Sequence, residues 1–331
     1  MVKPVIGITM GDPAGIGPEV CAKAMVSSGV RMVANPVIIG DRKVLREALK
    51  TAKIESVEIN SIKRVQEAKF ARDAIDVIDL DNVKLSSLKI GQVSKIAGKA
   101  AVEYLEKAIQ LAKNKEIEAI TTAPISKEAI HLAGYKFQGH TEILAKRFRV
   151  KNYGMLFVSD RFWLMLVTTH IPLRDVSRRL NKKKILNTIL LAHETLSKVR
   201  GKKIKIGVAG LNPHAGEAGI FGKEEGKIIK PAVDAALKLG VNVKGPISPD
   251  AIFHLANSGM FDLVVAMYHD QGLIPLKLLS FNRSVNVTVG LPVVRTSVDH
   301  GTGFDIAGKG WANPGSLIEA VRVAAHLARL K

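Results

Sequence analysis

The sequence predicts an α/β protein with mostly parallel sheets flanked by helices. Short runs of β-branched and apolar residues alternate along the chain with longer segments of helical periodicity, which is the pattern of strand–helix–strand units. At 331 residues the chain exceeds the usual size of a single domain, so we expect two lobes. A content of 47% hydrophobic and 24% charged residues supplies enough apolar side chains for two cores and argues against disorder.

Capping residues and helix breakers place the individual elements in order. Asp41 and Ser94 are suited to cap helices, and Pro18 is suited to open one. Strands are expected at residues 5–10, 37–40, 118–122, 205–209 and 262–267, with a hairpin of two buried strands over 153–167. Helices are expected at residues 18–28, 42–49, 95–113, 228–239 and 249–258, and from 314 or 315 toward the C-terminus.

The net charge of +19 is compatible with a nucleic-acid partner, an anionic substrate or a lysine-rich solvated surface. The lysines are spread along the chain, with local clusters only at 182–184 and 202–203. Aromatic residues make up 5% of the chain and do not alternate with the basic ones, which weakens the nucleic-acid interpretation. We expect a solvated surface that also attracts phosphorylated ligands, with nucleic-acid binding as a remote alternative.

The single cysteine, Cys21, excludes a disulfide framework and fits a reducing compartment. The first residues run from an early proline into a glycine loop and lack the apolar core and cleavage site of a signal peptide. The most apolar region, 153–167, is interrupted at 159–161 and is too short to span a bilayer. A cytoplasmic protein without a membrane partner is expected.

Glycine, histidine, asparagine and proline concentrate directly after the predicted strands, at the edge where α/β sheets bind ligands. The first such loop, residues 11–19, reads Gly-Asp-Pro-Ala-Gly-Ile-Gly-Pro-Glu. Its glycines match neither the G-x-G-x-x-G fingerprint of Rossmann folds nor a phosphate-binding P-loop, so the turn is either structural or functional. Asp12 in this loop is expected to bind or orient a ligand rather than to pack.

A second pair of candidates follows the strand at 118–122. Ser126 is suited to cap a helix, which places Lys127 in its first turn as a ligand contact or as an ordinary surface lysine. His140 and Thr141 begin another helix, whose free backbone N–H groups suit a phosphate or a carboxylate. His140 is therefore expected to contact a ligand, the alternative being an N-terminal capping role.

Three histidines, His170, His214 and His269, each lie after a predicted strand. Neutral imidazoles on separate strand-end loops can converge on one divalent cation and leave positions open for substrate and water. No local His-x-x-x-His spacing supports a metal site, and His170 by itself is also consistent with a buried core histidine. Asp270 and Gln271 follow His269, and because burying them without partners would be costly, we expect them to line a cleft.

Polar side chains also interrupt the strand-like apolar sequence of residues 274–297. Lys277, Asn286 and Arg295 need partners there. A phosphate suits the two cations, since arginine can bind it through two parallel hydrogen bonds, and an internal salt bridge is the alternative. The polar turn at 299–305 could contact a dinucleotide, although no residue is assigned to the cofactor.

The loop motifs together resemble the 4-hydroxythreonine-4-phosphate dehydrogenase family nearly from end to end. The matching strings are residues 11–18, 139–142 (Gly-His-Thr-Glu), 212–217 (Asn-Pro-His-Ala-Gly-Glu), 268–272 (Tyr-His-Asp-Gln-Gly) and 295–302 (Arg-Thr-Ser-Val-Asp-His-Gly-Thr). The resemblance implies a two-lobed fold similar to that of the isocitrate and isopropylmalate dehydrogenases. It also implies a homodimer with the active site at the subunit interface, and binding of NAD(P) without a Rossmann fingerprint.

The resemblance further implies the residues of the site. Drawn from both subunits, the ligands of a divalent metal (zinc, magnesium or cobalt) would be His170, His214 and His269. Substrate contacts carry over to His140, Thr141, Lys277, Asn286 and Arg295. Residues 1–135 with 290–331 would form a lobe on the cofactor side, and residues 136–289 would form the lobe of the metal, substrate and dimer contacts.

The implied reaction is a metal-dependent, NAD(P)-linked oxidation of 4-phosphohydroxy-L-threonine to 2-amino-3-oxo-4-phosphooxybutanoate. This product decarboxylates to 3-amino-2-oxopropyl phosphate in pyridoxal phosphate biosynthesis. Related enzymes oxidise D-threonate or D-erythronate 4-phosphate, and residues 274–277 and 298–305 resemble that branch at least as closely. The base for the hydroxyl proton could be Asp12, Lys127 or Asp270. Phosphate acyl transfer on a related fold, without metal or nicotinamide, is a competing enzyme class.

Overall fold

The computed structural model describes residues 2–200, 204–280 and 284–330, and the chain divides into two compact units. Unit 1 comprises Met1–Lys151 with Leu291–Lys331, and unit 2 comprises Asn152–Gly290. The sequence predicts that the chain leaves the first lobe near residue 135, whereas it leaves unit 1 after Lys151.

Helix α6 (His140–Phe148) accounts for this difference. It packs with α4 (Lys95–Lys113), where Arg147 Nε donates a hydrogen bond to Glu106 Oε1 at 2.6 Å. The predicted site residues His140 and Thr141 therefore belong to unit 1.

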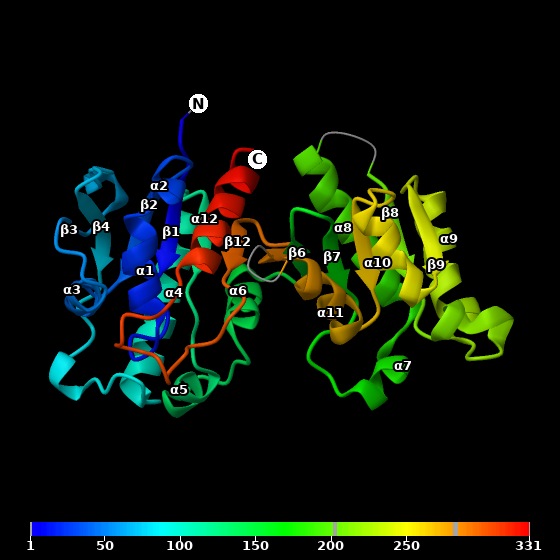
Figure 1. The fold of residues 1–331 in the computed structure, drawn as a ribbon, viewed down its shortest axis with the longest axis horizontal. Coiled ribbons are helices and arrows are strands. Elements are labelled where there is room, and N and C mark those ends of the chain that lie inside the picture. The colour runs from blue at the N-terminus through cyan, green and yellow to red at the C-terminus, as the bar shows by residue number, and fades with distance from the viewer. Residues whose placement is uncertain (1, 201–203, 281–283, 331) are drawn as a thin grey trace. The chain divides into compact units, whose positions relative to one another are not determined.

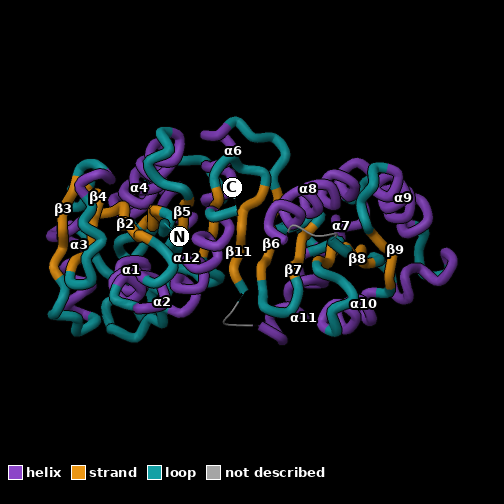
Figure 2. The backbone as a smooth tube through the Cα atoms, turned by 90° about the horizontal axis from the view of Figure 1, so that it is seen from above, coloured by secondary structure: helices purple, strands orange, loops and turns teal. Residues whose placement is uncertain are grey.

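Unit 1 is built on a parallel sheet (Figure 1). Within the described residues its strands lie in the order β3 (Glu58–Ile62), β4 (Ala74–Asp79), β2 (Asn35–Gly40), β1 (Val5–Thr9), β5 (Ala119–Thr122) and β12 (Val294–Ser297). Neighbouring strands in this order pair in parallel. Helix α4 covers one face, and the other face carries α1 (Gly17–Met25), α3 (Arg42–Thr51) and α12 (Gly315–Ala328) (Figure 2).

The predicted caps are present in unit 1. Asp41 accepts a hydrogen bond from Lys43 N at 2.8 Å at the start of α3, and Ser94 accepts one from Ala97 N at 3.2 Å at the start of α4. Each bond satisfies a backbone donor that the first helical turn leaves without a partner. Local side-chain chemistry thus determines where these helices begin.

Unit 2 has a mixed sheet. Within the described residues its strands lie in the order β11 (Val285–Val289), β6 (Gly154–Val158), β7 (Trp163–Leu166), β10 (Leu263–Ala266), β8 (Ile206–Ala209) and β9 (Val243–Ile247). Strand β6 pairs antiparallel with β11 and β7, which forms the predicted hairpin, and the remaining pairs are parallel. One face is covered by α8 (Lys182–Arg200) and α9 (Lys230–Lys238), and the other by α10 (Pro249–Asn257) and α11 (His269–Ser280) (Figure 2).

Helix α11 differs from the expectation of strand-like sequence around residue 274. It begins at His269 and includes Pro275 and Lys277. Leu273 and Leu276 are buried at helical spacing in the core between α11 and the sheet, whereas Ile274 is exposed. The buried stripe favours a helix here, so the strand-like interpretation of this segment was wrong.

The core of unit 2 is aromatic and aliphatic. Phe157, Phe162 and Leu164 of the hairpin region pack with Phe253 of α10 and with Phe261. This core fixes the strands whose carboxyl ends carry the predicted histidines. No helix in the described part of the chain is both long and apolar enough to cross a membrane.

Candidate active site

Three neighbouring parallel strands of unit 2 lead into the predicted metal residues. Strand β10 pairs in parallel with β7 on one side and with β8 on the other. His170 follows β7, His214 follows β8, and His269 follows β10 as the first residue of α11. Because the carboxyl ends of parallel strands meet at one edge of a sheet, the three histidines leave the same edge of unit 2.

Two of these histidines lie together. The ring centroids of His170 and His269 are 5.6 Å apart, with the planes inclined by 45°. His170 is exposed, so it is not the buried core histidine that its sequence context also allowed. His269 Nδ1 lies 2.6 Å from Asp270 Oδ1. A proton on Nδ1 donated to this carboxylate leaves the lone pair of the neutral ring on Nε2, which is the arrangement of a metal-binding histidine.

His214 lies in an unusual turn of the backbone. The five residues His214–Ala218 all have positive φ angles, between 43° and 82°. Only Gly216 among them is a glycine, and each of the other residues pays roughly 1–2 kcal/mol for this conformation. Strain of this kind is concentrated at functional sites and persists only where the surrounding structure enforces it.

The structure does not group His214 with the other two histidines. Among the residues it describes, no three His, Cys, Asp or Glu side chains are arranged to hold a metal ion. The His214 ring instead lies 6.3 Å from the ring of Phe221. Within a single chain, the rings of His170 and His269 therefore lie together. His214 lies apart from them, on the strained turn after β8.

The loops of this edge are tied together by buried polar groups. Thr168 Oγ1 donates to Met267 O at 2.7 Å. Gln271 Oε1 accepts from Met267 N at 2.6 Å, and Gln271 Nε2 donates to Gly210 O at 2.7 Å. Gln271 thus joins the ends of β10 and β8 with both ends of its amide satisfied. The prediction that Gln271 lines a cleft was wrong, since it is buried and serves the backbone.

Sequence reasoning missed three acidic residues around the turn that carries His214. Asp250 follows β9 at the start of α10, and its pKa is lowered mainly by the Ser248 hydroxyl and further by the charge of His214. Glu224 and Glu225 hold the segment before His214. For Asp250 the signal was available, because Ser-Pro-Asp directly after a strand is another polar strand end.

A second cluster of predicted residues lies in unit 1. Arg295 on β12 is 3% exposed and donates from Nη2 to Thr122 Oγ1 at 2.8 Å. Burial lowers the pKa of Arg295 to about 9. Burial, and then the charge of Arg295, holds the pKa of His140 well below its usual 6.5. A buried guanidinium beside a neutral imidazole suits an anion such as phosphate, whose charge would offset the cost of desolvation.

The remaining predicted substrate residues are divided between the units. Thr141 follows His140 in the first turn of α6 and is half-buried. Lys277 on α11 and Asn286 on β11 belong to unit 2 and are half-buried. The buried atoms His140 Nε2 and Asn286 Oδ1 have no hydrogen-bond partner among the described residues. Buried polar atoms without a hydrogen-bond partner are typical of catalytic or ligand-binding sites.

The glycine loop after β1 is buried throughout. Asp12 Oδ1 accepts a hydrogen bond from Ala14 N at 2.9 Å, and Asp12 N donates to Pro124 O at 2.9 Å. A Cβ atom on Gly17 would lie 2.2 Å from Met10 O, so this loop needs glycine for close backbone packing. Asp12 therefore does pack, contrary to the expectation from its position, and it orients its own loop.

The carboxyl group of Asp12 nevertheless has properties that suit a proton-transfer group. Burial raises its pKa from 3.8 to about 6, against the opposing effect of backbone hydrogen bonds from Ala14, Ser126 and Gly15. Its Oδ2 atom has no hydrogen-bond partner among the described residues. Lys127, the other candidate base of unit 1, is exposed in the first turn of α5 (Lys127–Leu132).

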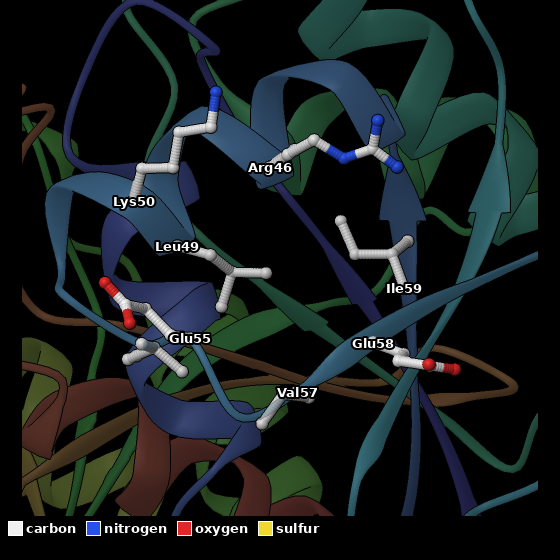
Figure 3. Close-up of a pocket in the computed structure, with 8 residues that line it drawn as sticks. Arg46, Leu49, Lys50, Glu55, Val57, Glu58 and Ile59 are labelled. Atoms are coloured by element: carbon white, nitrogen blue, oxygen red, sulfur yellow. The ribbon is translucent and has the colours of Figure 1, made fainter.

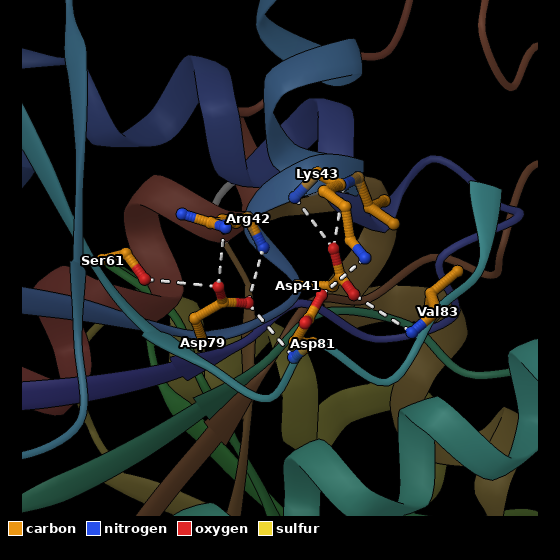
Figure 4. A network of polar contacts seen from close by, with 8 residues as sticks. Asp41, Arg42, Lys43, Ser61, Asp79, Asp81 and Val83 are labelled. Atoms are coloured by element: carbon orange, nitrogen blue, oxygen red, sulfur yellow. Dashed lines mark hydrogen bonds and ion pairs between the residues drawn. The ribbon is translucent and has the colours of Figure 1, made fainter.

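Two polar features of unit 1 contain none of the predicted site residues. A surface pocket of about 540 Å³ lies between α3 and β3, with Arg46, Lys50 and Glu58 on its wall (Figure 3). At the carboxyl ends of β2 and β4, Asp41 accepts from Val83 N at 3.0 Å, and Asp79 accepts from Arg42 N at 3.0 Å (Figure 4). These aspartates fasten loops of unit 1 to one another.

Known proteins resemble this chain over nearly its whole length. Residues 32–324 match the family described as "Pyridoxal phosphate biosynthetic protein PdxA". A 4-hydroxythreonine-4-phosphate dehydrogenase of Desulforapulum autotrophicum is 46% identical over 324 residues, which cover 98% of this chain and 95% of the relative. A Clostridium botulinum protein provisionally named D-threonate 4-phosphate dehydrogenase is 45% identical over 323 residues, which cover 98% of this chain and 96% of the relative.

A solved structure shows the same likeness. The crystal structure of 4-hydroxythreonine-4-phosphate dehydrogenase from Klebsiella pneumoniae is 42% identical in sequence and matches with a TM-score of 0.92. The match covers 99% of this chain and 98% of that chain. The predicted fold class, a mostly parallel α/β fold like that of the isocitrate and isopropylmalate dehydrogenases, is confirmed.

Proposed function

Because the chain belongs to the PdxA family of pyridoxal phosphate biosynthetic proteins, we propose that it oxidises 4-phosphohydroxy-L-threonine with NAD(P)+. The product, 2-amino-3-oxo-4-phosphooxybutanoate, is a β-keto acid and loses CO₂ readily to give 3-amino-2-oxopropyl phosphate. The observation that carries this proposal is the oriented pair of imidazoles, His170 and His269, at the carboxyl edge of the unit 2 sheet.

We assign one divalent cation per active site, zinc, magnesium or cobalt, to His170, His214 and His269. The donor set fits such an ion, since the first and last of these rings lie together and His269 is held by Asp270 through Nδ1. When bound, the cation lowers the pKa of the substrate hydroxyl and stabilises the charge that develops on its oxygen. Three imidazole ligands from the protein would leave room at such a site for the substrate.

We assign the contacts with the substrate's anionic groups to His140, Thr141, Lys277, Asn286 and Arg295. In unit 1, Arg295 and His140 offer a buried guanidinium and an unsatisfied ring nitrogen, and Thr141 begins the same helix as His140. In unit 2, Lys277 offers an ammonium and Asn286 an unsatisfied amide oxygen. Such groups fix the register of the substrate, so that the oxidised carbon meets the nicotinamide in one orientation.

We propose a homodimer with the active site at the interface, and the surface of α11 supports it. Ile274 and Leu278 lie one helical turn apart and are 63% and 85% exposed, and the adjacent Leu279 is 45% exposed. Apolar side chains gathered on one helix are typical of a protein–protein contact. Because α11 begins at His269, a second copy covering this helix would approach the proposed metal ligands.

The base that takes the hydroxyl proton is assigned to Asp12, Lys127 or Asp270. A pKa of about 6 suits Asp12 to proton transfer near neutral pH. Asp270 already holds His269, which favours a positioning role for that carboxylate. The turn at 299–305 is our candidate for contact with the dinucleotide, and no residue of it is assigned to the cofactor.

We place the protein in the cytoplasm, in keeping with a single buried cysteine, and with no partner other than its substrate, cofactor, metal and second copy. Nucleic-acid binding remains a remote alternative that the positive charge alone supports. It predicts steeply salt-dependent affinity for DNA or RNA.

A second candidate function is the oxidation of D-threonate or D-erythronate 4-phosphate, which the relative from Clostridium botulinum favours. All three substrates would use the same phosphate contacts and the same metal. They would differ in the group at carbon 2. The test is NAD(P)H formation with each of the three phosphorylated acids. We expect the highest kcat/KM with 4-phosphohydroxy-L-threonine. A preference for either sugar acid would establish the second function, and no NAD(P)H with any of them would overturn both.

A further inference from the structure

The strained turn that carries His214 is held by one buried carboxylate. Glu225 is 5% exposed and begins the short π-helical turn Glu225–Ile229. Its Oε1 atom accepts hydrogen bonds from Leu211 N and Asn212 N, both at 2.8 Å. Its Oε2 atom accepts from Asn212 Nδ2 at 3.0 Å. Glu225 thus fastens the two residues at the entrance of the turn, directly before Pro213 and His214.

The same carboxylate also lies against the middle of the turn. A Cβ atom placed on Gly216 would be 2.7 Å from Glu225 Oε2, so the backbone approaches the carboxylate as closely as a glycine allows. The chain closes on itself beyond this point, where Phe221 N donates to Gly216 O at 3.2 Å. Glu225 and this closing bond therefore both hold Gly216, the buried residue in the middle of the left-handed turn.

A second carboxylate connects this turn to the segment after His170. Glu224 Oε2 accepts from Asn212 Nδ2 at 2.9 Å, and Glu224 Oε1 accepts from Ser177 Oγ at 2.6 Å. Ser177 lies on α7 (Val176–Arg179), which follows His170 in the chain. The Ser177 hydroxyl, with Asn212, holds the pKa of Glu224 below its usual value, so the link is made by an ionised group.

We infer that Glu225 is a positioning residue, which holds the left-handed turn so that His214 can bind the divalent cation. Glu224 joins this turn to the His170 segment. The inference rests on the metal role proposed for His214. Neither glutamate needs to touch the cation. Residues that orient the ligands of a metal typically change its affinity by ten- to a hundredfold when they are replaced.

The test measures Co²⁺ binding to the full-length protein by visible absorbance, after removal of bound metal. In Glu225→Gln the amide nitrogen would oppose the Asn212 amide, so we expect Co²⁺ affinity to fall by about ten- to a hundredfold. Asn212→Ala keeps the Glu225 carboxylate and removes only the side-chain bonds, so it should show a smaller loss in the same direction. The Asn212→Ala variant also tests the inference if Glu225→Gln does not fold.

The control is Glu194→Gln, which removes an exposed carboxylate of unit 2 that pairs with Lys198 at 2.7 Å. It should bind Co²⁺ as the wild type does. A purely structural role of Glu225 would lower the melting temperature of the metal-free protein without weakening Co²⁺ binding, and that result would overturn the inference.

His214→Ala separates the inference from the proposed function. If His214→Ala weakens Co²⁺ binding and the Glu225 and Asn212 variants do not, the positioning role of Glu225 is contradicted and the metal role of His214 is supported. If His214→Ala binds Co²⁺ as tightly as the wild type, both fall.

Discussion

The Nδ1 atom of His269 lies 2.6 Å from the Oδ1 atom of Asp270, at the first turn of α11. The two residues are neighbours in the sequence, so the orienting group and the oriented ring come from one short motif. The His170 ring on the adjacent strand end lies 5.6 Å away. This relationship holds the His269 ring in one orientation and leaves its Nε2 atom as the nitrogen of the proposed metal site.

Asp270→Asn should weaken metal binding through His269. The neutral amide is a poorer acceptor for the Nδ1 proton than a carboxylate, so the ring loses its fixed orientation and part of its basicity. We expect Zn²⁺ affinity to fall by about ten- to a hundredfold, measured by competition with a chromophoric chelator. Unchanged affinity would mean that the contact is incidental. Asp234→Asn, an exposed change on α9, is the control.

Arg295→Met should separate substrate binding from stability. The change removes a desolvated cation, so we expect the free energy of unfolding to stay level or to rise. Loss of a buried charged contact to phosphate typically costs about 2–5 kcal/mol, so kcat/KM should fall by at least about thirtyfold. Steady-state kinetics and urea unfolding measure the two effects. Arg322→Met, on the exposed side of α12, is the matched control, and equal kinetics in the two variants would refute the assignment.

Asp12 should make stability depend on pH with a defined sign. Its carboxyl holds a proton more tightly in the folded protein, with a pKa of about 6, than at the ordinary 3.8. The folded state therefore gains from protonation at low pH, and this gain is lost as the pH rises through about 6. The loss is about 3 kcal/mol for a shift of this size.

Comparison with Asp12→Asn isolates this effect. The stability of the wild type relative to Asp12→Asn should fall by about 2–3 kcal/mol between pH 4 and pH 7. Urea unfolding of both proteins at the two pH values measures the difference. A constant difference would show that folding does not raise the pKa of the Asp12 carboxyl.

Gly98→Ala should destabilise unit 1, against the usual effect of this change within a helix. Alanine normally improves helix stability by roughly 0.5–1 kcal/mol over glycine. At Gly98 on α4, the added Cβ would lie 2.0 Å from Ala129 O of α5, so we expect a loss of about 1–3 kcal/mol. Gly226→Ala, where a Cβ meets nothing within 4 Å, is the control and should be neutral or stabilising. Equal effects would refute close packing at Gly98.

Elements with local signals could be predicted from the sequence. The helices after Asp41 and Ser94 begin where the capping side chains place them. The segment after His269 could not be predicted in this way, because its helix depends on the burial of Leu273 and Leu276 against strands distant in sequence. An apolar run of this length fits a strand or a helix until its packing partner is known.

The same distinction applies to the candidate site. Residues with a local sequence signal could be predicted, and residues held by contacts between distant segments could not. The order of strand ends placed His170, His214 and His269 at one edge, since parallel neighbours end together. No comparable sequence pattern indicated the two glutamates, Glu224 and Glu225, that hold the His214 turn. Glu225 binds backbone N–H groups 13 and 14 residues away, and such bonds follow no sequence pattern. Asp12 was placed correctly on its loop, but only the packing showed that it is buried.

Metal-dependent reduction of NAD(P)+ tests the central claim most directly. Protein stripped with a chelator is given 4-phosphohydroxy-L-threonine and NAD(P)+, and nicotinamide absorbance is followed before and after Zn²⁺, Mg²⁺ or Co²⁺ is restored. We predict that the wild type forms NAD(P)H only after a divalent ion returns, and that His170→Ala, His214→Ala and His269→Ala do not recover. Equal rates with and without chelator, or full recovery of any of these variants, would contradict a metal held by three imidazoles.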